Sequence, residues 1–389
     1  MKNAKEKINI LYIDIEGGWG GSSRSLYYLI RHLDRTKYEP VVLYGKEGPN
    51  RVRYKEMGVP AYLFSPIPRV RALKKNNHKS LAIFILKLIH LPRFLVFVKR
   101  IIRLHKIQVI HMNQSCLFFV ALFLKRMADC KIVYHVRTML PKNIFGKIQM
   151  CIVRKTADYI IFITENEQSL WHEVCPLTKN IPQSVIYNSA EPVYGDGGGR
   201  LLGEYPDRFR IAAMSTMTYT RGIDRLLDVA HFLREKNHNR SLFVICSQEG
   251  RRNAYAESIR RDVAKRGLGE FFLFLGYQSN PERLLSECSA FIHLTRDHNP
   301  WGRNIIEAIA QGKPVISIGA YQGFVQDAVN GYLLPEFDPE VISEKIIYLS
   351  DNPAVVKSME EENIKKGKRL FDARANTEKV VSVYEGLMV

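Results

Sequence analysis

Short apolar runs alternate along this chain with longer segments of helical spacing. The runs are about four to eight residues long, and Gly, Pro or polar residues bound most of them. Runs of this length are typical of buried strands, and parallel strands need a crossover connection between them. The pattern therefore predicts an α/β protein built on parallel sheets. In the first half, the expected strands are residues 8–15, 40–44, 61–64, 109–112, 132–136, 159–164 and 184–187.

A second series of the same kind begins after a glycine-rich stretch at residues 195–199. Its expected strands are residues 210–214, 242–246, 271–275, 291–294, 314–318 and 331–333, with helices at 223–236 and 254–266. A length of 389 residues allows two domains, each with its own core. We expect an N-terminal domain at 1–190, a linker at 191–208 and a C-terminal domain at 209–371. A helical tail at about 372–389 is expected to rejoin the first domain.

Composition adds one unusual property, which is charge. A hydrophobic fraction of 46% and a charged fraction of 25% are ordinary for a globular protein, but the net charge is +18. Such an excess predicts an anionic partner: nucleic acid, an acidic membrane or a phosphorylated substrate. The six cysteines show no CxxC spacing, and the N-terminus reads as a strand without a cleavage site. Both features favour a reducing cytoplasm.

The most informative stretch is residues 295–314, TRDHNPWGRNIIEAIAQGKP. It lies between two expected strands and combines a polar loop with an apolar helix from about Arg303 to Ala310. Ligands of parallel sheets bind at the carboxyl ends of strands, where helices begin. Backbone N–H groups near Trp301, Gly302 and Arg303 are therefore expected to face an anion such as a diphosphate. Glu307 has apolar neighbours, so its carboxylate needs a partner, which ribose hydroxyls would supply.

This stretch resembles the signature of the retaining GT-B glycosyltransferases of family 4. Their motif is Glu, seven residues and Glu, followed by Gly-x-Pro-Val-Ile, and residues 307–316, EAIAQGKPVI, match its second half. The resemblance implies two Rossmann-like domains facing each other across a cleft. It also implies that Glu307 holds the nucleotide ribose. The first Glu, near the donor sugar, is replaced by Asn299, which can bond a sugar hydroxyl but carries no charge.

Further positions follow from the same resemblance. Arg221 matches a Lys that grips the donor diphosphate, whereas Thr216 replaces an Arg of the family. A His-x-Arg pair at the end of an N-terminal strand, His135 and Arg137, would face the donor sugar and the acceptor. The predicted catalytic residues are therefore His135, Arg137 and Asn299. The predicted donor-binding residues are Gly20, Gly21, Thr216, Arg221, Gly276, Tyr277, Trp301, Gly302, Arg303, Asn304 and Glu307.

A basic segment at residues 69–106 has no place in this site. No Asp or Glu occurs from residue 57 to residue 128, while cationic and apolar residues alternate. The segment is too interrupted to span a bilayer and fits a pair of amphipathic helices lying on an anionic membrane. The predicted contacts are Lys74, Lys75, Lys99, Arg100 and Arg103. The alternative is a solvated basic face over an ordinary core. No nucleic-acid module is visible, so we expect no nucleic acid as a partner.

These features predict a retaining, hexosyl-type transferase on the inner face of the cell membrane. It would move a sugar from a UDP- or GDP-linked donor to a glycan or lipid-linked acceptor in bacterial polysaccharide or lipopolysaccharide synthesis. No cofactor beyond this substrate is expected, and the absence of an Asp-x-Asp motif favours metal-independent chemistry. Two alternatives stay open: a nucleotide-sugar epimerase of the same fold, and a catalytically degenerate glycan-binding subunit on the membrane.

Overall fold

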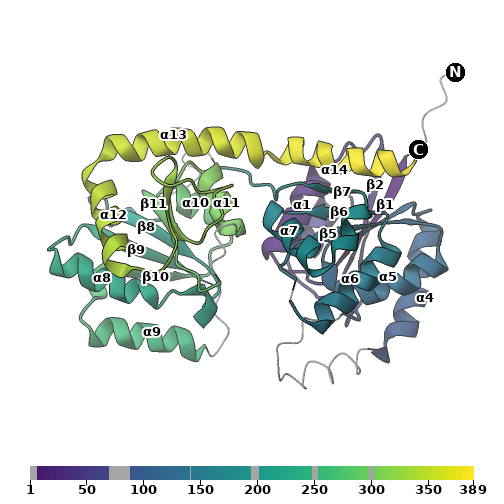
Figure 1. Cartoon of the computed structure of the whole chain (residues 1–389), viewed down its shortest axis with the longest axis horizontal. Coiled ribbons are helices and arrows are strands. Elements are labelled where there is room, and N and C mark those ends of the chain that lie inside the picture. The colour runs from purple at the N-terminus through teal and green to yellow at the C-terminus, as the bar shows by residue number, and fades with distance from the viewer. Residues whose placement is uncertain (1–6, 70–87, 141, 194–200, 248–252, 298–301) are drawn as a thin grey trace. The chain divides into compact units, whose positions relative to one another are not determined.

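The computed structural model describes residues 7–69, 88–140, 142–193, 201–247, 253–297 and 302–389 (Figure 1). The chain divides into two compact units. The N-terminal unit comprises Met1–Ser189 together with Ala373–Val389, and the C-terminal unit comprises Ala190–Asp372. Each unit contains one parallel sheet with helices packed on its faces.

The N-terminal unit is built on a seven-stranded sheet of order β3-β2-β1-β4-β5-β6-β7. Every pair in it is parallel, so all the strands end at the same edge. The chain order reverses between β1 and β4, and ligands of such sheets bind at this kind of switch point. The strands are β1 (Ile8–Asp14), β2 (Tyr38–Tyr44), β3 (Ala61–Leu63), β4 (Val109–Met112), β5 (Lys131–Val136), β6 (Tyr159–Phe162) and β7 (Gln183–Val185).

Helices cover both faces of this sheet because its strands are apolar on both sides. In β1, Leu11 and Ile13 face one core while Ile10 and Tyr12 face the other, as the two-residue period requires. The first core is closed by α4 (Leu91–Leu104), α5 (Phe118–Met127), α6 (Ile144–Thr156) and α7 (Glu165–Val174). The second core is closed by α1 (Gly21–Arg31), α2 (Asn50–Glu56) and α14 (Ala373–Leu387).

The C-terminal unit repeats this plan with six parallel strands of order β10-β9-β8-β11-β12-β13. Its switch point lies between β8 and β11. The strands are β8 (Phe209–Met214), β9 (Ser241–Cys246), β10 (Phe272–Gly276), β11 (Ala290–His293), β12 (Val315–Ile318) and β13 (Gly331–Leu334). The helices are α8 (Arg225–Glu235), α9 (Ala254–Lys265), α10 (Pro281–Ser286), α11 (Arg303–Ala310), α12 (Pro339–Asp351) and α13 (Pro353–Leu370), with a 3-10 turn η3 at Tyr219–Arg221.

The predicted fold class, two Rossmann-like parallel sheets, is confirmed. The observed strands differ from the predicted ranges by a few residues at their ends, and α11 has the predicted bounds. In the basic segment, α4 accounts for one of the two expected helices, whereas residues 70–87 lie outside the described residues.

Candidate functional site

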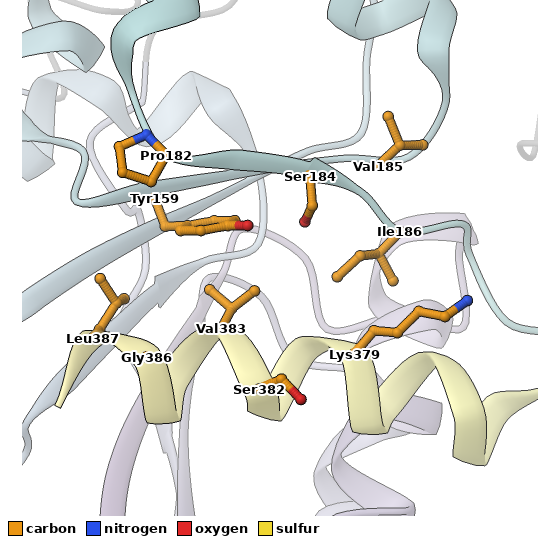
Figure 2. A pocket seen from close by; sticks show the side chains of 10 residues that line it. All are labelled: Tyr159, Pro182, Ser184, Val185, Ile186, Lys379, Ser382, Val383, Gly386 and Leu387. Carbon is orange, nitrogen blue, oxygen red and sulfur yellow. The ribbon is translucent and has the colours of Figure 1, made fainter. Parts of the chain in front are cut away.

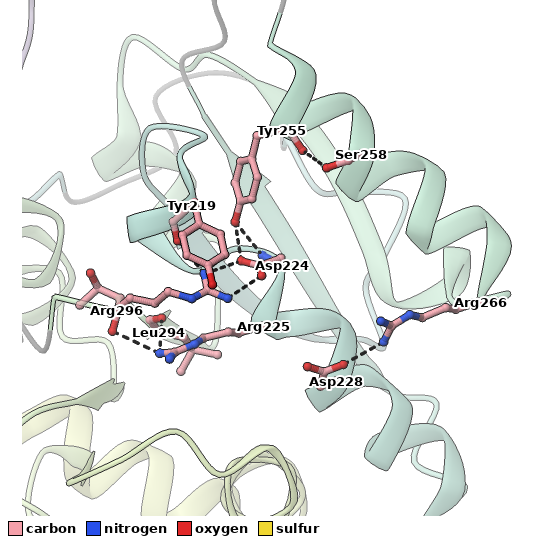
Figure 3. Close-up of polar contacts among 10 residues, drawn as sticks. Tyr219, Asp224, Arg225, Asp228, Tyr255, Ser258, Arg266, Leu294 and Arg296 are labelled. Carbon is pink, nitrogen blue, oxygen red and sulfur yellow. Dashed lines mark hydrogen bonds and ion pairs between the residues drawn. The ribbon is translucent and has the colours of Figure 1, made fainter. Parts of the chain in front are cut away.

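The loops after β8 and β11 are joined at the switch point of the C-terminal unit (Figure 3). Arg296 donates to both carboxylate oxygens of Asp224, at 2.8 and 2.6 Å, and to the carbonyl oxygen of Tyr219 at 2.6 Å. The Thr295 hydroxyl donates to the carbonyl oxygen of Thr220 at 3.0 Å. A bidentate Arg–carboxylate pair fixes geometry as well as charge. The two loops therefore form a single rigid rim.

The Asp224 carboxylate receives a further hydrogen bond, from the Tyr255 hydroxyl of α9. Burial opposes ionisation of this carboxyl, but the hydrogen bonds from Arg296 and Tyr255 outweigh burial and hold its pKa below the usual range. Asp224 and Arg296 thus neutralise each other, and neither is available to a ligand.

Two more arginines lie between β8 and the first turn of α8, and they differ in what they contact. Arg225 donates to the carbonyl oxygens of Leu294 and Thr295 at 3.2 and 3.3 Å. The Arg221 side chain makes no hydrogen bond or ion pair with any described residue. Gly222 follows it with φ +68°, and a Cβ there would lie 2.0 Å from the carbonyl oxygen of Leu294. Only glycine permits this close approach of the two loops. Among the described arginines of the rim, Arg221 is therefore the one available for an anion.

Helix α11 begins beside this rim because it follows β11 in a parallel sheet. The Asn304 side chain donates to the carbonyl oxygen of Met214 at 2.6 Å and lies 3.3 Å from His293 Nδ1. The predicted donor ligand Asn304 therefore ties α11 to the ends of β8 and β11. Gly302 caps the helix with extended backbone, so the positive end of the helix dipole lies at the carboxyl edge of the sheet.

Glu307 is almost completely buried on α11. Its Oε1 lies 2.7 Å from Arg303 Nε, one helical turn earlier, and the two side chains are 4% and 10% exposed. A buried carboxylate needs such a partner, because desolvation penalises an isolated charge. The predicted residues Arg303 and Glu307 therefore act as a pair in this structure.

The other predicted donor residues of the C-terminal unit lie at the same edge or outside the described residues. Thr216 is exposed on the loop after β8, and Gly276, with φ +68°, ends β10 beside the half-exposed Tyr277. Asn299 and Trp301 lie outside the described residues. The predicted residues that the structure describes in this unit therefore lie along the carboxyl edge of its sheet, at the ends of β10, β8 and β11.

At the N-terminal switch point, the glycine-rich loop after β1 is held by a buried glutamine. Gln114 donates to Asp14 Oδ1 at 2.6 Å and to Ser22 Oγ at 3.0 Å, and its carbonyl oxygen accepts from the Ile15 N–H at 3.2 Å. Gly20 caps α1 and Gly21 begins it, and a Cβ at Gly20 would meet nothing within 4 Å. The loop therefore leaves open space at the predicted residue Gly20, while the predicted residue Gly21 forms the first turn of α1. Sequence reasoning missed Gln114, although a polar residue directly after a buried strand was a usable signal.

His135 and Arg137 lie at the end of β5 within a buried chain of polar side chains. Arg137 Nη2 and His111 Nε2 each lie 3.2 Å from His135 Nδ1, and the Tyr384 hydroxyl lies 2.6 Å from His111 Nδ1. Arg137 Nε also donates to Asn113 Oδ1 at 2.9 Å. The sequence carried no signal for the role of His111 or Tyr384, because Tyr384 belongs to the distant helix α14.

The tautomers in this chain follow from its fixed donor. Arginine can only donate, so His135 Nδ1 accepts and the proton of the neutral ring is on Nε2. Because His135 Nδ1 carries no proton, His111 must donate to it through its Nε2–H. The other ring nitrogen of the neutral His111, Nδ1, then accepts a hydrogen bond from the Tyr384 hydroxyl. Burial, assisted by the charge of Arg137, lowers the pKa of His111 to about 3 and holds that of His135 well below its usual value. His135 is therefore a neutral hydrogen-bond donor and not a general base near neutral pH.

The donor face of His135 adjoins a very small cavity. His135 Nε2 has no hydrogen-bond partner among the described residues, and the ring lines a space of about 20 Å³ together with Arg137 and Asn188. Such a volume holds about one water molecule. An unpaired buried N–H is costly, so the free donor identifies this point as a place where a hydroxyl group can bind.

A larger cavity lies elsewhere on the N-terminal unit. It measures about 490 Å³ and lies between α14 and the strands β6 and β7 (Figure 2). Its lining is mainly apolar, with Tyr159, Val383 and Leu387 around it and Lys379 at one end. The described residues that line it include none of the predicted site residues, so this cavity is separate from the site.

Comparisons with known proteins agree with this arrangement. Residues 19–192 match the model of Glycosyltransferase Family 4, and residues 201–369 match that of Glycosyl transferases group 1. A poly(ribitol-phosphate) alpha-N-acetylglucosaminyltransferase of Staphylococcus aureus is 26% identical over 145 residues, which are 36% of this chain and 28% of that protein. The chain thus aligns with less than a third of the length of this curated relative.

Solved structures share the fold at low sequence identity. Anabaena Alr3699/HepE in complex with UDP-glucose superposes with a TM-score of 0.79 at 17% identity, covering 97% of this chain and 100% of that one. A glycosyltransferase from Rickettsia africae gives a TM-score of 0.77 at 16% identity, covering 98% and 99%. Two family models that between them match nearly the whole chain, together with this fold, show that the chain belongs to the GT-B glycosyltransferases, with a family 4 N-terminal half and a group 1 C-terminal half.

Proposed function

We propose that this protein transfers a sugar from a nucleotide-sugar to a glycan or lipid-linked acceptor. The C-terminal unit would bind the donor, and the observation that carries this proposal is the free cation of Arg221. It lies on the rim formed by the β8 and β11 loops, at the edge where α11 begins. A cation and a helix N-terminus at one switch point form a site for a diphosphate.

In the proposed reaction, the bond between the sugar C1 and the donor diphosphate breaks, and an acceptor hydroxyl forms the new glycosidic bond while its proton passes to the leaving diphosphate oxygen. Negative charge develops on the leaving diphosphate, where Arg221 and the N-terminus of α11 stabilise it. Glu307 would hold the ribose while paired with Arg303. We propose retention through attack from the same face without a protein nucleophile. We also propose chemistry without a metal, because the sequence contains no Asp-x-Asp motif.

The N-terminal unit would bind the acceptor and the reacting sugar. The free Nε2–H of His135 supports this role, since it can donate to a sugar hydroxyl, and Arg137 fixes its orientation. Asn299 would contact the donor sugar in place of the family carboxylate. HepE has been solved in complex with UDP-glucose, and the staphylococcal relative is named for a phosphate-rich polymer. We therefore favour a UDP-linked donor and a polymeric or lipid-linked acceptor.

We further propose peripheral attachment to the inner face of the cell membrane. Helix α4 carries the predicted contacts Lys99, Arg100 and Arg103, while Lys74 and Lys75 lie outside the described residues. Among the described residues, no helix is long and apolar enough to cross a membrane. A polybasic amphipathic helix instead supports binding at the membrane surface.

Donor hydrolysis tests the transferase. The full chain, incubated with UDP- and GDP-sugars, should release nucleoside diphosphate slowly without acceptor, and the matching sugar should raise its melting temperature. Arg221→Ala should lose both effects, whereas Arg266→Ala, which removes a cation at the end of α9 paired with Asp228, should keep them. Thermal stabilisation without hydrolysis under any condition would instead favour the glycan-binding subunit. Interconversion of the free nucleotide-sugar would favour the epimerase.

A further inference from the structure

The helices α4, α5 and α6 lie side by side on one face of the N-terminal sheet (Figure 1) and contain no acidic residue. We call their outward faces the α4–α6 surface. The three helices carry nine cationic residues: Arg93, Lys99, Arg100, Arg103, Lys125, Arg126, Lys147, Arg154 and Lys155. The sequence prediction of a basic surface stopped at Lys106. The structure shows that the charge extends across two more helices.

Exposed apolar residues lie among these cations on both outer helices. On α4, Val96 is 70% exposed and Leu104 is 66% exposed, and Arg100 lies between them on the same helical stripe. On α6, Ile144 is 64% exposed and Ile148 is 45% exposed. The stripe of α6 continues through the exposed Cys151 and Lys155, opposite the buried Met150 and Val153. Both helices therefore present mixed apolar and cationic faces away from the core.

Most of the cations on this surface have no carboxylate partner in the part of the chain that the structure describes. Lys125 is an exception, since it pairs with Asp158 at 2.5 Å. On α6, the cationic residues Lys147, Arg154 and Lys155 make no ion pair with any described residue. The surface ends at α7, which is acidic, and there Glu173 pairs with Lys142 at 2.7 Å. On this side of the unit the basic surface thus ends at α6.

We propose that the α4–α6 surface lies against an anionic phospholipid membrane and that α6 is its second contact helix. This inference rests on the membrane attachment proposed above and deepens it. Anionic lipids attract unpaired cations, and the exposed Ile144 and Ile148 gain by entering the interface.

The position of α6 links this contact to the proposed reaction. Helix α6 follows β5, so Ile144 lies at its first turn, near the carboxyl edge that carries His135 and Arg137. Met139, in the same connection, is also 42% exposed. A membrane at this surface would present the sugar of a lipid-linked acceptor to that edge. We therefore favour a lipid-linked acceptor over a soluble glycan.

The test uses the full chain and sedimentation with phosphatidylglycerol-containing or pure phosphatidylcholine vesicles. Ile144→Ser/Ile148→Ser and Lys147→Glu/Lys155→Glu should each weaken binding to anionic vesicles by about tenfold. The matched control is Val52→Ser/Lys55→Glu, which changes an exposed apolar and a cationic residue of α2, on the opposite face of the sheet. This control should bind as the parent does. Unchanged melting temperatures would show that all variants are folded.

Each contrary outcome has a separate meaning. If both α6 variants bind like the parent while Val96→Ser/Arg100→Glu loses binding, α4 alone contacts the membrane and the inference is wrong. Equal binding of the parent to both vesicle types, or no binding, would overturn the membrane proposals. Donor hydrolysis would still report on the transferase separately. If the α6 changes alter only the oligomeric state by light scattering, the surface joins two copies of the chain and the inference is also wrong.

Discussion

The two units share one architecture but differ in where they carry charge. The N-terminal unit has 33 Lys and Arg against 14 Asp and Glu, a net charge of +19, whereas the C-terminal unit has 24 against 25, a net charge of −1. The charge of the whole chain thus belongs to the unit proposed to meet acceptor and membrane. The nearly neutral unit is proposed to bind an anionic diphosphate through Arg221, which has no partner among the described residues, and through a helix end.

The units also differ in how their proposed sites are protected. In the N-terminal unit the polar chain from Tyr384 to His135 is buried, and within this chain the His135 Nε2–H has no partner among the described residues. In the C-terminal unit the rim is exposed and rigid because Arg296 and Asp224 neutralise each other. The net charge of a unit and the chemistry of its proposed site are therefore separate properties.

Glu307→Gln should abolish detectable transfer. It removes the proposed ribose ligand and also breaks the buried ion pair with Arg303, which costs about 3 kcal/mol or more of stability. The double variant Arg303→Gln/Glu307→Gln separates the two effects. Its melting temperature should recover toward that of the parent while nucleotide binding, measured by calorimetry, stays lost. Recovery of binding together with stability would show that Glu307 acts only through the ion pair.

Arg221→Ala should lower kcat/KM by about 100-fold, the effect of removing one stabilising donor from a developing anion. The melting temperature should not change, because the side chain has no partner among the described residues. Arg225→Ala is the contrasting variant: it should lower stability, since it removes hydrogen bonds to two carbonyl oxygens. Normal kinetics for Arg221→Ala would place the diphosphate elsewhere and break the proposed contrast between the units.

His135→Asn should lower kcat by about tenfold, as expected when a single hydrogen-bond donor to the reacting sugar is lost. The asparagine oxygen can still accept from Arg137 and His111, so the neighbouring chain is kept. Tyr384→Phe should have a smaller effect, through the orientation of His111. Nitrogen-15 chemical shifts of His135 give a readout independent of activity. A protonated Nδ1 in the parent would contradict the proposed donor role.

The smallest expected effect is a change in the free energy of unfolding with pH, and it should arise in the N-terminal unit. His111 has a pKa of about 3 when folded, against 6.5 when free, and the pKa of His135 is lowered in the same direction. Their unfolded forms bind protons that the folded forms exclude. The stabilisation is therefore complete above pH 6.5 and is lost as pH falls, by about 1.4 kcal/mol per pH unit for each histidine. Unfolding by denaturant between pH 7 and 5 should show a shallower slope for His135→Asn. An unchanged slope would mean that His135 takes up a proton in the folded state.

Much of the fold could be predicted because its signals are local. Apolar runs bounded by Gly, Pro and polar residues located the strands within a few residues, and the Gly302-to-Gly312 segment gave the bounds of α11. Several candidate site residues could be named by motif, since the loop, the helix start and Glu307 are adjacent in the chain. The two sheets and the α/β class follow from the same periodicity.

The sequence by itself determined the elements, the two-domain plan and the set of candidate residues. Tertiary structure alone decided which candidates are free to act. Arg221, Arg225 and Arg296 look alike in sequence, yet two of them are bound to the rim and one has no partner among the described residues. The partners of His135 come from β4 and α14, and the basic surface is completed by α6. The physical reason is that hydrogen-bond satisfaction and burial depend on contacts between residues far apart in the chain, which no local pattern records.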